Sequence, residues 1–568
     1  MKYDEALKFL NAAADKLKVE YYQPKEGELF YYRGLANKAL GHGEEAYEDL
    51  ARSTWYYQWF SAGNYQLALI ESQNGNFEKA LEYVREAYST NTRDGRITVL
   101  YSSLLRKNGE KDKANSLLEK QITYDPLNFA AIYEKGLLEG KSSMSEWHKN
   151  MQDIENNYLE IATHYMNAGL LEDGVALLST LDNPKNPLVH YYLSWFNSNL
   201  GNDIKAKEYL SSAENCSLDY SFPYRAETET VLKNAIQIDS ENAMAYYLLG
   251  NLYYDNRPNQ AMTSWEKAGT IDTSIPLVWR NLAFGDFYHK KNPKKAIEHM
   301  TKAISLNGNN PLWFAELSKY YDESDEDFSQ NLEILRNNIE IVKKDVSAPK
   351  SFVQLLNLNG EYDEAISFLD EHHFRTWEGG RETYWHYVDA HTLKARELMN
   401  NKDYQKSISH LERALEYPEN LEVGKPTHDE KNALIYYFMG EAYEQMGNTK
   451  KAKESFQKCA NAQNGRGMYD LLYYQAEAHK KLGNADMAST MFKDLIKRAQ
   501  QYRNQGDDNT LVAVEEASAT NKKAISNSYY LEALGNMGLG NEAVANKLLK
   551  ESVKTYNNNL WAKIMMNI

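Results

Sequence analysis

The chain has 568 residues, a formal net charge of −16 and two cysteines. No basic stripe accompanies the acidic balance, which disfavours binding to the phosphate backbone of nucleic acids and to anionic membrane surfaces. Cys216 and Cys459 are too few and too far apart in sequence for a disulfide framework or a metal cluster, and no apolar run of 18 residues predicts a transmembrane helix.

The first residues, MKYDEALKFLNAA, predict an amphipathic helix with acidic residues rather than a signal peptide. They resemble the second helix of a hairpin whose first helix is absent, so we expect the chain to be a fragment of a longer protein. We therefore expect a cytoplasmic protein by default, and a periplasmic or extracellular one if an upstream segment was removed.

Small residues recur with a period near 34 along the chain. Ala46, Ala80 and Ala114 are 34 residues apart, and Ala261 and Ala296 are 35 apart. This period is typical of stacked helical hairpins, in which a small residue of the second helix lies close to the first helix. We place further second helices on Ala6, Gly174 or Ala176, Ala206, Ala365, Ser407, Ala452, Ala488 and Ala543, for about 14 hairpins in all.

Two stretches, 246–276 and 434–461, carry a fuller motif. Gly250 and Gly440 stand where two helices must approach, while Gly447 and Asn448 suit the left-handed backbone of a helix end. These stretches resemble the tetratricopeptide repeat. The resemblance implies an all-α fold, a right-handed superhelical solenoid with a concave groove, and a binding function. We divide it into N-terminal repeats (1–150), central repeats with inserted loops (151–460), and C-terminal repeats with a cap (461–568).

The period fails at four places, where we expect insertions. Repeat arrays tolerate insertions in loops that cluster on one face and often carry the function. The irregular stretches are 114–174, with about 26 extra residues near 140–151, then 206–261, 365–452 and 488–543.

Four motifs in the irregular regions stand in one order: 222–225, 279–281, 377–380 and 417–425. This order is similar to the repeat region of a bacterial family that joins an N-terminal galactose-mutarotase-like β-sandwich of unknown function to C-terminal tetratricopeptide repeats. The resemblance covers roughly residues 150–460. It implies a carbohydrate-related role carried largely by the sandwich, which this sequence lacks, and it implies that domain as a partner in cis or in trans.

The irregular motifs supply the side chains that a sugar-binding pocket needs, namely aromatic faces beside charged groups. Trp377, Glu378 and Arg381 fit this role, but the same residues also fit a glycine-rich corner with a buried Trp and an internal ion pair. Arg225 and Arg280 suit either an anionic or polyhydroxyl ligand or a helix cap. The candidate ligand-binding residues are Phe222, Tyr224, Arg225, Trp279, Arg280, Trp377, Glu378, Arg381, Tyr417, Asn420 and Lys425.

No catalytic residue, metal ligand or cofactor is predicted. His386 and His391 are five residues apart, which does not place two ligands on one helix face, and the local motifs of metalloproteases, serine hydrolases and phosphate loops are absent from the sequence. We therefore expect a binding scaffold, rather than an enzyme, that presents a helical groove to a protein or peptide partner. The alternative is a carbohydrate-binding or carbohydrate-active component with a pocket around Trp279, Trp377 and Tyr417, which requires the irregular loops to meet on one face.

Overall fold

The computed structural model describes residues 2–20, 25–152, 154–324, 326–375, 380–426, 431–464, 469–504 and 517–566. The chain divides into two compact units, Met1–Thr273 (unit 1) and Ser274–Ile568 (unit 2). Within the described ranges the regular structure is helical and contains no β-strand, which confirms the predicted all-α class. None of these helices combines the length and the apolarity needed to cross a bilayer.

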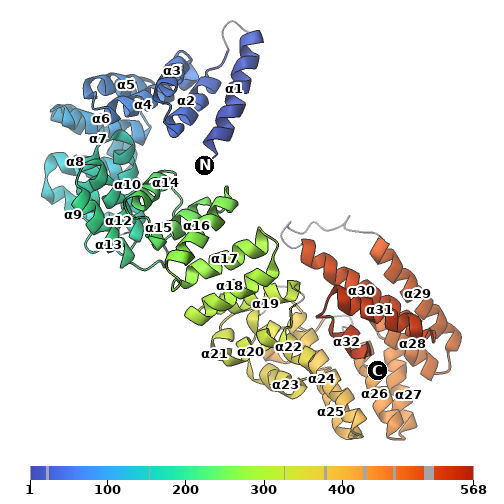
Figure 1. Ribbon diagram of the computed structural model, residues 1–568. Coiled ribbons are helices and arrows are strands. Elements are labelled where there is room, and N and C mark those ends of the chain that lie inside the picture. The colour runs from blue at the N-terminus through green and yellow to red at the C-terminus, as the bar shows by residue number, and fades with distance from the viewer. Residues whose placement is uncertain are drawn as a thin grey trace. The chain divides into compact units, whose positions relative to one another are not determined.

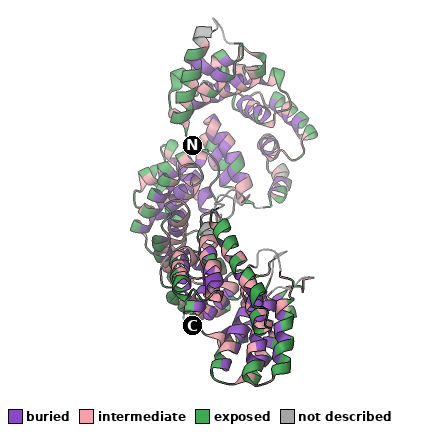
Figure 2. Cartoon of the chain, turned by 90° about the vertical axis from the view of Figure 1, so that its right-hand side faces the viewer, coloured by how far each residue is buried: buried purple, intermediate pink, exposed green. Residues whose placement is uncertain are grey.

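Unit 1 is built from helices that pack in consecutive pairs, such as α2 with α3 and α4 with α5 (Figure 1). Buried residues form stripes between the paired helices, while exposed residues cover the outer faces (Figure 2). Its helices are α1 (Tyr3–Glu20), α2 (Glu28–Leu40), α3 (Gly43–Ser53), α4 (Tyr57–Gln73), α5 (Phe77–Thr90), α6 (Gly95–Lys107), α7 (Lys111–Tyr124), α8 (Phe129–Glu139), α9 (Lys141–Met151), α10 (Glu155–Ala168), α11 (Leu171–Leu178), α12 (Pro187–Asn199), α13 (Asp203–Glu214), α14 (Glu227–Ile238), α15 (Ala243–Tyr253) and α16 (Pro258–Ile271).

Unit 2 continues the paired arrangement, with one continuous hydrophobic core that extends from α17 to α32. Its helices are α17 (Pro276–Tyr288), α18 (Pro293–Leu306), α19 (Pro311–Glu323), α20 (Ser329–Asn337), α21 (Ile339–Val342), α22 (Ala348–Asn359), α23 (Tyr362–Glu371), α24 (Glu382–Asn400), α25 (Tyr404–Arg413), the 3₁₀ turn η1 (Glu419–Leu421), α26 (Asn432–Gln445), α27 (Thr449–Ala460), α28 (Leu471–Lys481), α29 (Ala485–Asn504), α30 (Ala517–Gly538), α31 (Glu542–Thr555) and α32 (Leu560–Met566).

The hairpin α15/α16 shows why this sequence forms a close helix pair. A Cβ at Gly250 would come nearer to the Trp265 indole than van der Waals contact permits, so only glycine lets α16 lay its Trp ring against α15. Ala261 on α16 is fully buried. Asn242 caps α15 by accepting a hydrogen bond from the backbone N–H of Ala245, and Pro258 occupies the first turn of α16, where its missing N–H costs nothing.

The stretch between Ala114 and Gly174 is a repeat rather than an insertion, which corrects the prediction of about 26 extra residues near 140–151. A short hairpin, α8/α9, stands there and is followed by the pair α10/α11. Trp147 of α9 is fully buried, donates its indole N–H to the carbonyl of Phe129 at 2.9 Å, and packs against Tyr133 and Tyr158. Because a large aromatic residue fills this hairpin, the small-residue period does not reveal it.

The other irregular stretches also contain more helix than the period predicts. An additional helix, α14, stands between the pairs α12/α13 and α15/α16. In the stretch 365–452, the described residues 372–375 and 414–426 lie outside the α-helices, in and beside the predicted insertions, and α24 is also long, with 19 residues. In the stretch 488–543, α29 and α30 have 20 and 22 residues, and most of the predicted insertion, from residue 505, lies outside the described residues. The compact units meet at 273/274, whereas the sequence-based domains end at 150 and 460, and those boundaries stay a prediction.

Within unit 2, the last helices return to the first ones. Asp322 at the end of α19 receives the ammonium group of Lys523 at 2.6 Å, the side-chain amide of Asn558 at 3.0 Å, and the hydroxyl of Tyr556. In Figure 1 the red helices α30 to α32 accordingly lie across from the yellow-green helices α19 to α22. Unit 2 is therefore a closed arrangement of helices and not an open row.

Candidate binding site

The arrangement of unit 2 forms a cavity of about 680 Å³ that is open to solvent on one side. Three helices that each open a hairpin, α19, α22 and α24, supply most of its wall at intervals of three or four residues, because such positions share one face of a helix. Asn331 of α20, Ser347 just before α22 and the segment from α30 to α32 supply the rest. The lining residues are Leu312, Ala315, Glu316, Ser318, Lys319, Tyr321, Asp322, Asn331, Ser347, Lys350, Ser351, Gln354, Leu355, Glu382, Trp385, His386, Lys523, Tyr556 and Asn558.

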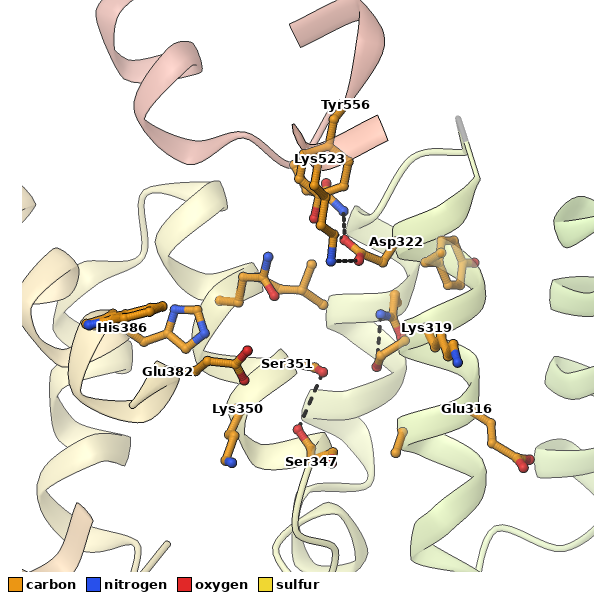
Figure 3. Close-up of a pocket in the computed structure, with 18 of the residues that line it drawn as sticks. Glu316, Lys319, Asp322, Ser347, Lys350, Ser351, Glu382, His386, Lys523 and Tyr556 are labelled. Carbon is orange, nitrogen blue, oxygen red and sulfur yellow. Dashed lines mark hydrogen bonds and ion pairs between the residues drawn. The ribbon is translucent and has the colours of Figure 1, made fainter. Parts of the chain in front are cut away.

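Three ionisable side chains of this wall are left without a hydrogen bond or ion pair to any described residue: Lys350 of α22, and Glu382 and His386 of α24. Burial, together with the positive charges of Lys431 and Lys350, lowers the pKa of His386, against the opposing effect of nearby carboxylates. The imidazole is therefore neutral at pH 7 and offers one donor and one acceptor. Figure 3 shows Glu382 and Ser351 approaching the middle of the cavity from neighbouring helices.

The charged side chains of α19 and of the rim each have a partner, on α17 or within the wall. Glu316 forms a two-point ion pair with Arg280, whose Nε donates to Oε2 at 3.1 Å. Lys319 donates to the hydroxyl of Tyr288 at 2.9 Å. At the upper rim in Figure 3, Lys523 and Tyr556 meet at Asp322. These contacts hold α19 and the rim in place, whereas Lys350, Glu382 and His386 stand on α22 and α24.

The chemistry of the cavity is that of recognition. Asn331 donates to the Ser318 hydroxyl at 3.2 Å, while its buried amide oxygen has no partner. Such an atom is costly to leave unsatisfied, so it favours occupation by a polar group. Among the residues with assigned positions, no group of three His, Cys, Asp or Glu side chains could hold a metal ion.

In unit 1, the predicted residues Phe222, Tyr224 and Arg225 lie on the segment between α13 and α14. The rings of Phe222 and Tyr224 point to solvent, with exposed fractions of 67% and 62%. Arg225 is buried instead: its Nε donates to Oε2 of Glu160 at 2.8 Å and its Nη2 donates to the carbonyl of Asn156 at 2.7 Å. Arg225 thus anchors the segment onto α10.

In unit 2, Trp279 and Arg280 stand on α17. One face of the Trp279 ring is covered by the ammonium group of Lys302, which is 3.4 Å from the ring centroid. Arg280 reaches the cavity wall through its ion pair with Glu316. Arg280 therefore binds a residue of the cavity wall but does not itself line the cavity.

The fourth predicted motif follows α25 and contacts the first turn of α24. Tyr417 stacks on Tyr384 with the ring centroids 4.0 Å apart. The Asn420 amide donates to the carbonyls of Leu369 and His372 at 2.7 and 2.8 Å, so it joins the loop after α25 to the loop after α23. Lys425 is exposed.

The remaining residues of that prediction are Arg381, Trp377 and Glu378. Arg381 is half-buried and directly precedes Glu382. Trp377 and Glu378 lie outside the described residues, so the proposed meeting of all four motifs stays a prediction.

Sequence reasoning missed Lys350, Glu382 and His386 as a group. Glu382 and His386 are four residues apart on one helix, a spacing that places both on one face. That signal was available, but the sequence contains many such pairs. The cavity is visible only once α22 and α24 are placed side by side.

Comparison with known families places tetratricopeptide repeats on the hairpins described above. Tetratricopeptide repeat models match residues 62–93, 388–421, 433–465 and 470–508. These ranges cover α4/α5 in unit 1 and α24/α25, α26/α27 and α28/α29 in unit 2. A TPR repeat-containing protein of Methanocaldococcus jannaschii is 23% identical in an alignment of 404 positions that covers 64% of this chain and 66% of that protein, just under two thirds of its length.

Solved structures of helical-repeat proteins are also similar, at low whole-chain superposition scores. The human IFIT1 dimer with m7Gppp-AAAA has 15% identity and a TM-score of 0.24, with 69% of this chain and 88% of that chain covered. The P58(IPK) TPR domain has 14% identity and a TM-score of 0.21, with 81% and 99% covered. Tetratricopeptide repeats are thus detected in both units of the chain.

Proposed function

We propose that this chain is a protein-binding scaffold and that its partner engages the cavity of unit 2. The repeat fold itself suggests protein binding. The observation that supports the cavity as the site is the set of three unpartnered polar side chains, Lys350, Glu382 and His386, on its wall.

A peptide segment suits these groups better than an apolar ligand. Its backbone carries a donor and an acceptor at nearly every residue, so it can pair with a cation, an anion and a neutral imidazole at once. Hydrogen bonds to charged groups contribute about 1.5–3 kcal/mol each, so two or three of them in a preformed cavity account for a specific interaction.

The carbohydrate alternative has no comparable support. Trp279 and Tyr417, the two described aromatic residues of that proposed pocket, each have one ring face covered, by Lys302 and by Tyr384. The family resemblance adds one candidate partner for the scaffold, a galactose-mutarotase-like β-sandwich in cis or in trans.

Site-specific photo-crosslinking tests the proposal. A photoreactive amino acid at Ser351, which lines the cavity, should capture a partner in cells, while the same group at the exposed Ser305 of α18 should not. Equal capture at both positions would show that the partner does not use the cavity.

A charge-reversal series on the captured and purified partner completes the test. Lys350→Glu should weaken binding by about tenfold or more, because it loses a charge-assisted hydrogen bond and adds repulsion near Glu382. The exposed Lys295→Glu on α18 changes the net charge equally and should leave the affinity unchanged. If both variants weaken binding to the same extent, the attraction is a general charge effect and the cavity is not the site.

A further inference from the structure

Helix α32 has only seven residues, and its order depends on what it packs against. Isolated helices shorter than about 12–15 residues are marginal in water, so tertiary contacts must hold a helix of this length. Ala562 and Met565 of α32 are nevertheless buried, with exposed fractions of 0% and 6%. The surface that holds α32 is therefore a good receptor for a short helix.

The first part of this receptor is the carboxylate of Asp389, which accepts a hydrogen bond from the indole of Trp561. The indole N–H of Trp561 donates to Oδ1 of Asp389 on α24 at 3.0 Å, and Lys431 binds the same oxygen at 2.6 Å. The Trp561 ring also meets the edge of Tyr474 on α28, with centroids 6.5 Å apart. Two helices that each open a hairpin, α24 and α28, thus share the recognition of one side chain.

The second part is an aromatic ring for a cation. The ammonium group of Lys563 lies 4.7 Å from the ring centroid of Phe328, which directly precedes α20. Burial lowers the pKa of this lysine. The side chains that α32 presents to this surface follow a short pattern. An aromatic hydrogen-bond donor, Trp561, is followed two residues later by a cation, Lys563, and four residues later by an apolar residue, Met565.

The segment before α32 provides an anchored pivot. Asn559 is buried and donates to the Ser526 hydroxyl at 3.0 Å and to the Asn527 amide oxygen at 3.1 Å, both on α30. Tyr556 and Asn558, just before it, line the cavity. The receptor for α32 is therefore connected to the cavity by one continuous segment. Asn559 also accepts hydrogen bonds from the backbone N–H groups of Ala562 and Lys563, so it links the first turn of α32 to α30.

We propose that the α32 receptor, formed by Asp389, Tyr474 and Phe328, is an interaction surface for a short amphipathic helix of a partner protein, which displaces α32. The partner helix carries an aromatic hydrogen-bond donor, followed by a cation and an apolar residue at the spacings of Trp561, Lys563 and Met565. This inference rests on the proposed scaffold function and identifies the chemistry of one segment of the partner.

The tethered α32 competes with such a partner. An attached segment acts at an effective concentration in the millimolar range, so a free helix of equal intrinsic affinity binds only weakly until the tethered one is loosened. Weakening α32 without altering its receptor should therefore increase the affinity for an added helix.

A synthetic peptide with the sequence of residues 559–568, labelled with fluorescein, tests this in the full chain. Anisotropy should show weak binding to the wild-type chain and binding at least about tenfold tighter to Trp561→Ala. Lys563→Ala, a milder change, should give an intermediate gain and covers the case in which Trp561→Ala destabilises the chain. Trp55→Ala, an exposed tryptophan of unit 1, should bind like wild type.

Two further arms separate the possible outcomes. Adding Asp389→Ala to Trp561→Ala should abolish most of the gain, because the indole loses its acceptor, and a peptide with the tryptophan replaced by alanine should bind much more weakly. Equal peptide affinity for the wild-type, Trp561→Ala and Lys563→Ala chains would overturn the inference. Lys350→Glu should leave peptide binding unchanged, so a failure of the cavity as a partner site is distinguishable from a failure of the α32 receptor.

Discussion

A single methyl group is expected to decide how closely α15 and α16 can pack. Gly250 faces the indole of Trp265, which donates its N–H to the carbonyl of Tyr247 at 3.2 Å and to the side-chain oxygen of Asn251 at 3.0 Å. The ring is held from several directions and cannot yield to an added Cβ without losing these bonds.

Gly250→Ala should therefore lower the free energy of unfolding by about 1–3 kcal/mol, the usual cost of overpacking. The matched control is Gly43→Ala in the first turn of α3, where an added Cβ meets nothing within 4 Å. Urea unfolding followed by circular dichroism measures both. A Gly250→Ala chain as stable as the Gly43→Ala chain would contradict the tight contact.

Two histidines of unit 2 face each other in a buried place. The Nδ1 atoms of His391 on α24 and His410 on α25 are 3.0 Å apart, so one must carry a proton and the other must accept it. Burial, then the positive charge of Arg413 and then His410, lower the pKa of His391 to about 3. The pKa of His410 is lowered as well, by burial, Arg413 and Lys394, against the opposing effect of Asp363 and Asp370.

Stability should therefore fall in mild acid. The unfolded chain takes up a proton on each histidine near pH 6.5, whereas folded His391 remains neutral down to about pH 3, so the unfolded state binds more protons in between. His391 alone should reduce the free energy of unfolding by up to about 1.4 kcal/mol per pH unit as the pH drops below 6.5. Urea unfolding between pH 5 and 8 should show a shallower pH dependence for His391→Gln than for wild type, and parallel curves would disprove this assignment.

At the residue scale, the sequence predicts the residues that recur at set places in the hairpins, but it does not predict contacts that occur only once. Gly250, Gly440 and Ala261 were recognised because each recurs at a set place in a hairpin. The sequence pairs His391 with His386 on the same helix as possible metal ligands and gives no sign of His410, because this partner of His391 lies on the next helix. Contacts between helices depend on packing angles that the order of residues alone does not reveal.

At the scale of elements, the short hairpin α8/α9 is joined to its neighbours by a buried charge cluster. Glu134 of α8 is fully buried and binds Arg106 of α6 through two hydrogen bonds of 2.8 and 3.0 Å. Tyr165 of α10 donates to the same carboxylate at 2.7 Å, and Arg106 also pairs with Asp173 of α11. One carboxylate thus positions three consecutive hairpins.

Glu134→Ala should destabilise the chain by about 3–5 kcal/mol, because Arg106 would be left as a buried charge with weakened compensation. Glu139→Ala, at the exposed end of the same helix, removes a surface pair with Lys135 and should cost less than about 1 kcal/mol. Thermal unfolding of both variants distinguishes the two cases. If the two melting temperatures agree, the cluster does not stabilise the unit.

Elements were predictable wherever the sequence repeated its small residues. The helices around Ala46, Ala80, Ala261 and Ala296 stand where the period of about 34 places them. Helix α9 was missed because Trp147 takes the place of a small residue. The extra length around α24 and α25 lies partly in the segments between helices, where the sequence predicts insertions, and partly in the 19-residue helix α24. Periodicity counts residues and does not distinguish a longer helix from an insertion.

At the scale of the whole molecule, each unit should unfold with its own stability. In repeat proteins each hairpin contacts mainly its neighbours, so a local defect spreads only as far as the cooperative unit extends. Gly440 faces Phe456 in unit 2 as Gly250 faces Trp265 in unit 1.

Gly440→Ala should therefore reduce hydrogen-exchange protection within 274–568 and leave residues 2–273 unchanged, while Gly250→Ala should do the reverse. Exchange followed by mass spectrometry after proteolysis measures both variants. A uniform loss of protection in either variant would show that the chain unfolds as one cooperative body.

The closure of unit 2 lay beyond what the sequence could predict. The contacts that carry it join Asn558 to Asp322 and Trp561 to Asp389, across 236 and 172 residues. A repeat pattern reports on neighbours, and these residues are separated by many hairpins. The cavity and the α32 receptor both depend on this closure. The sequence pattern therefore predicts candidate sites in the irregular loops and gives no sign of those on the inner helix faces.

The carboxylate of Asp322 also gives unit 2 a distinct elasticity. An open helical array stretches like a spring, because a pulling force only tilts each hairpin against the next. Unit 2 cannot extend in this way until Asp322 releases Lys523, Tyr556 and Asn558 and Asp389 releases Trp561. Under tension it should remain stiff and then lengthen abruptly, so that two carboxylates act together as a mechanical clasp.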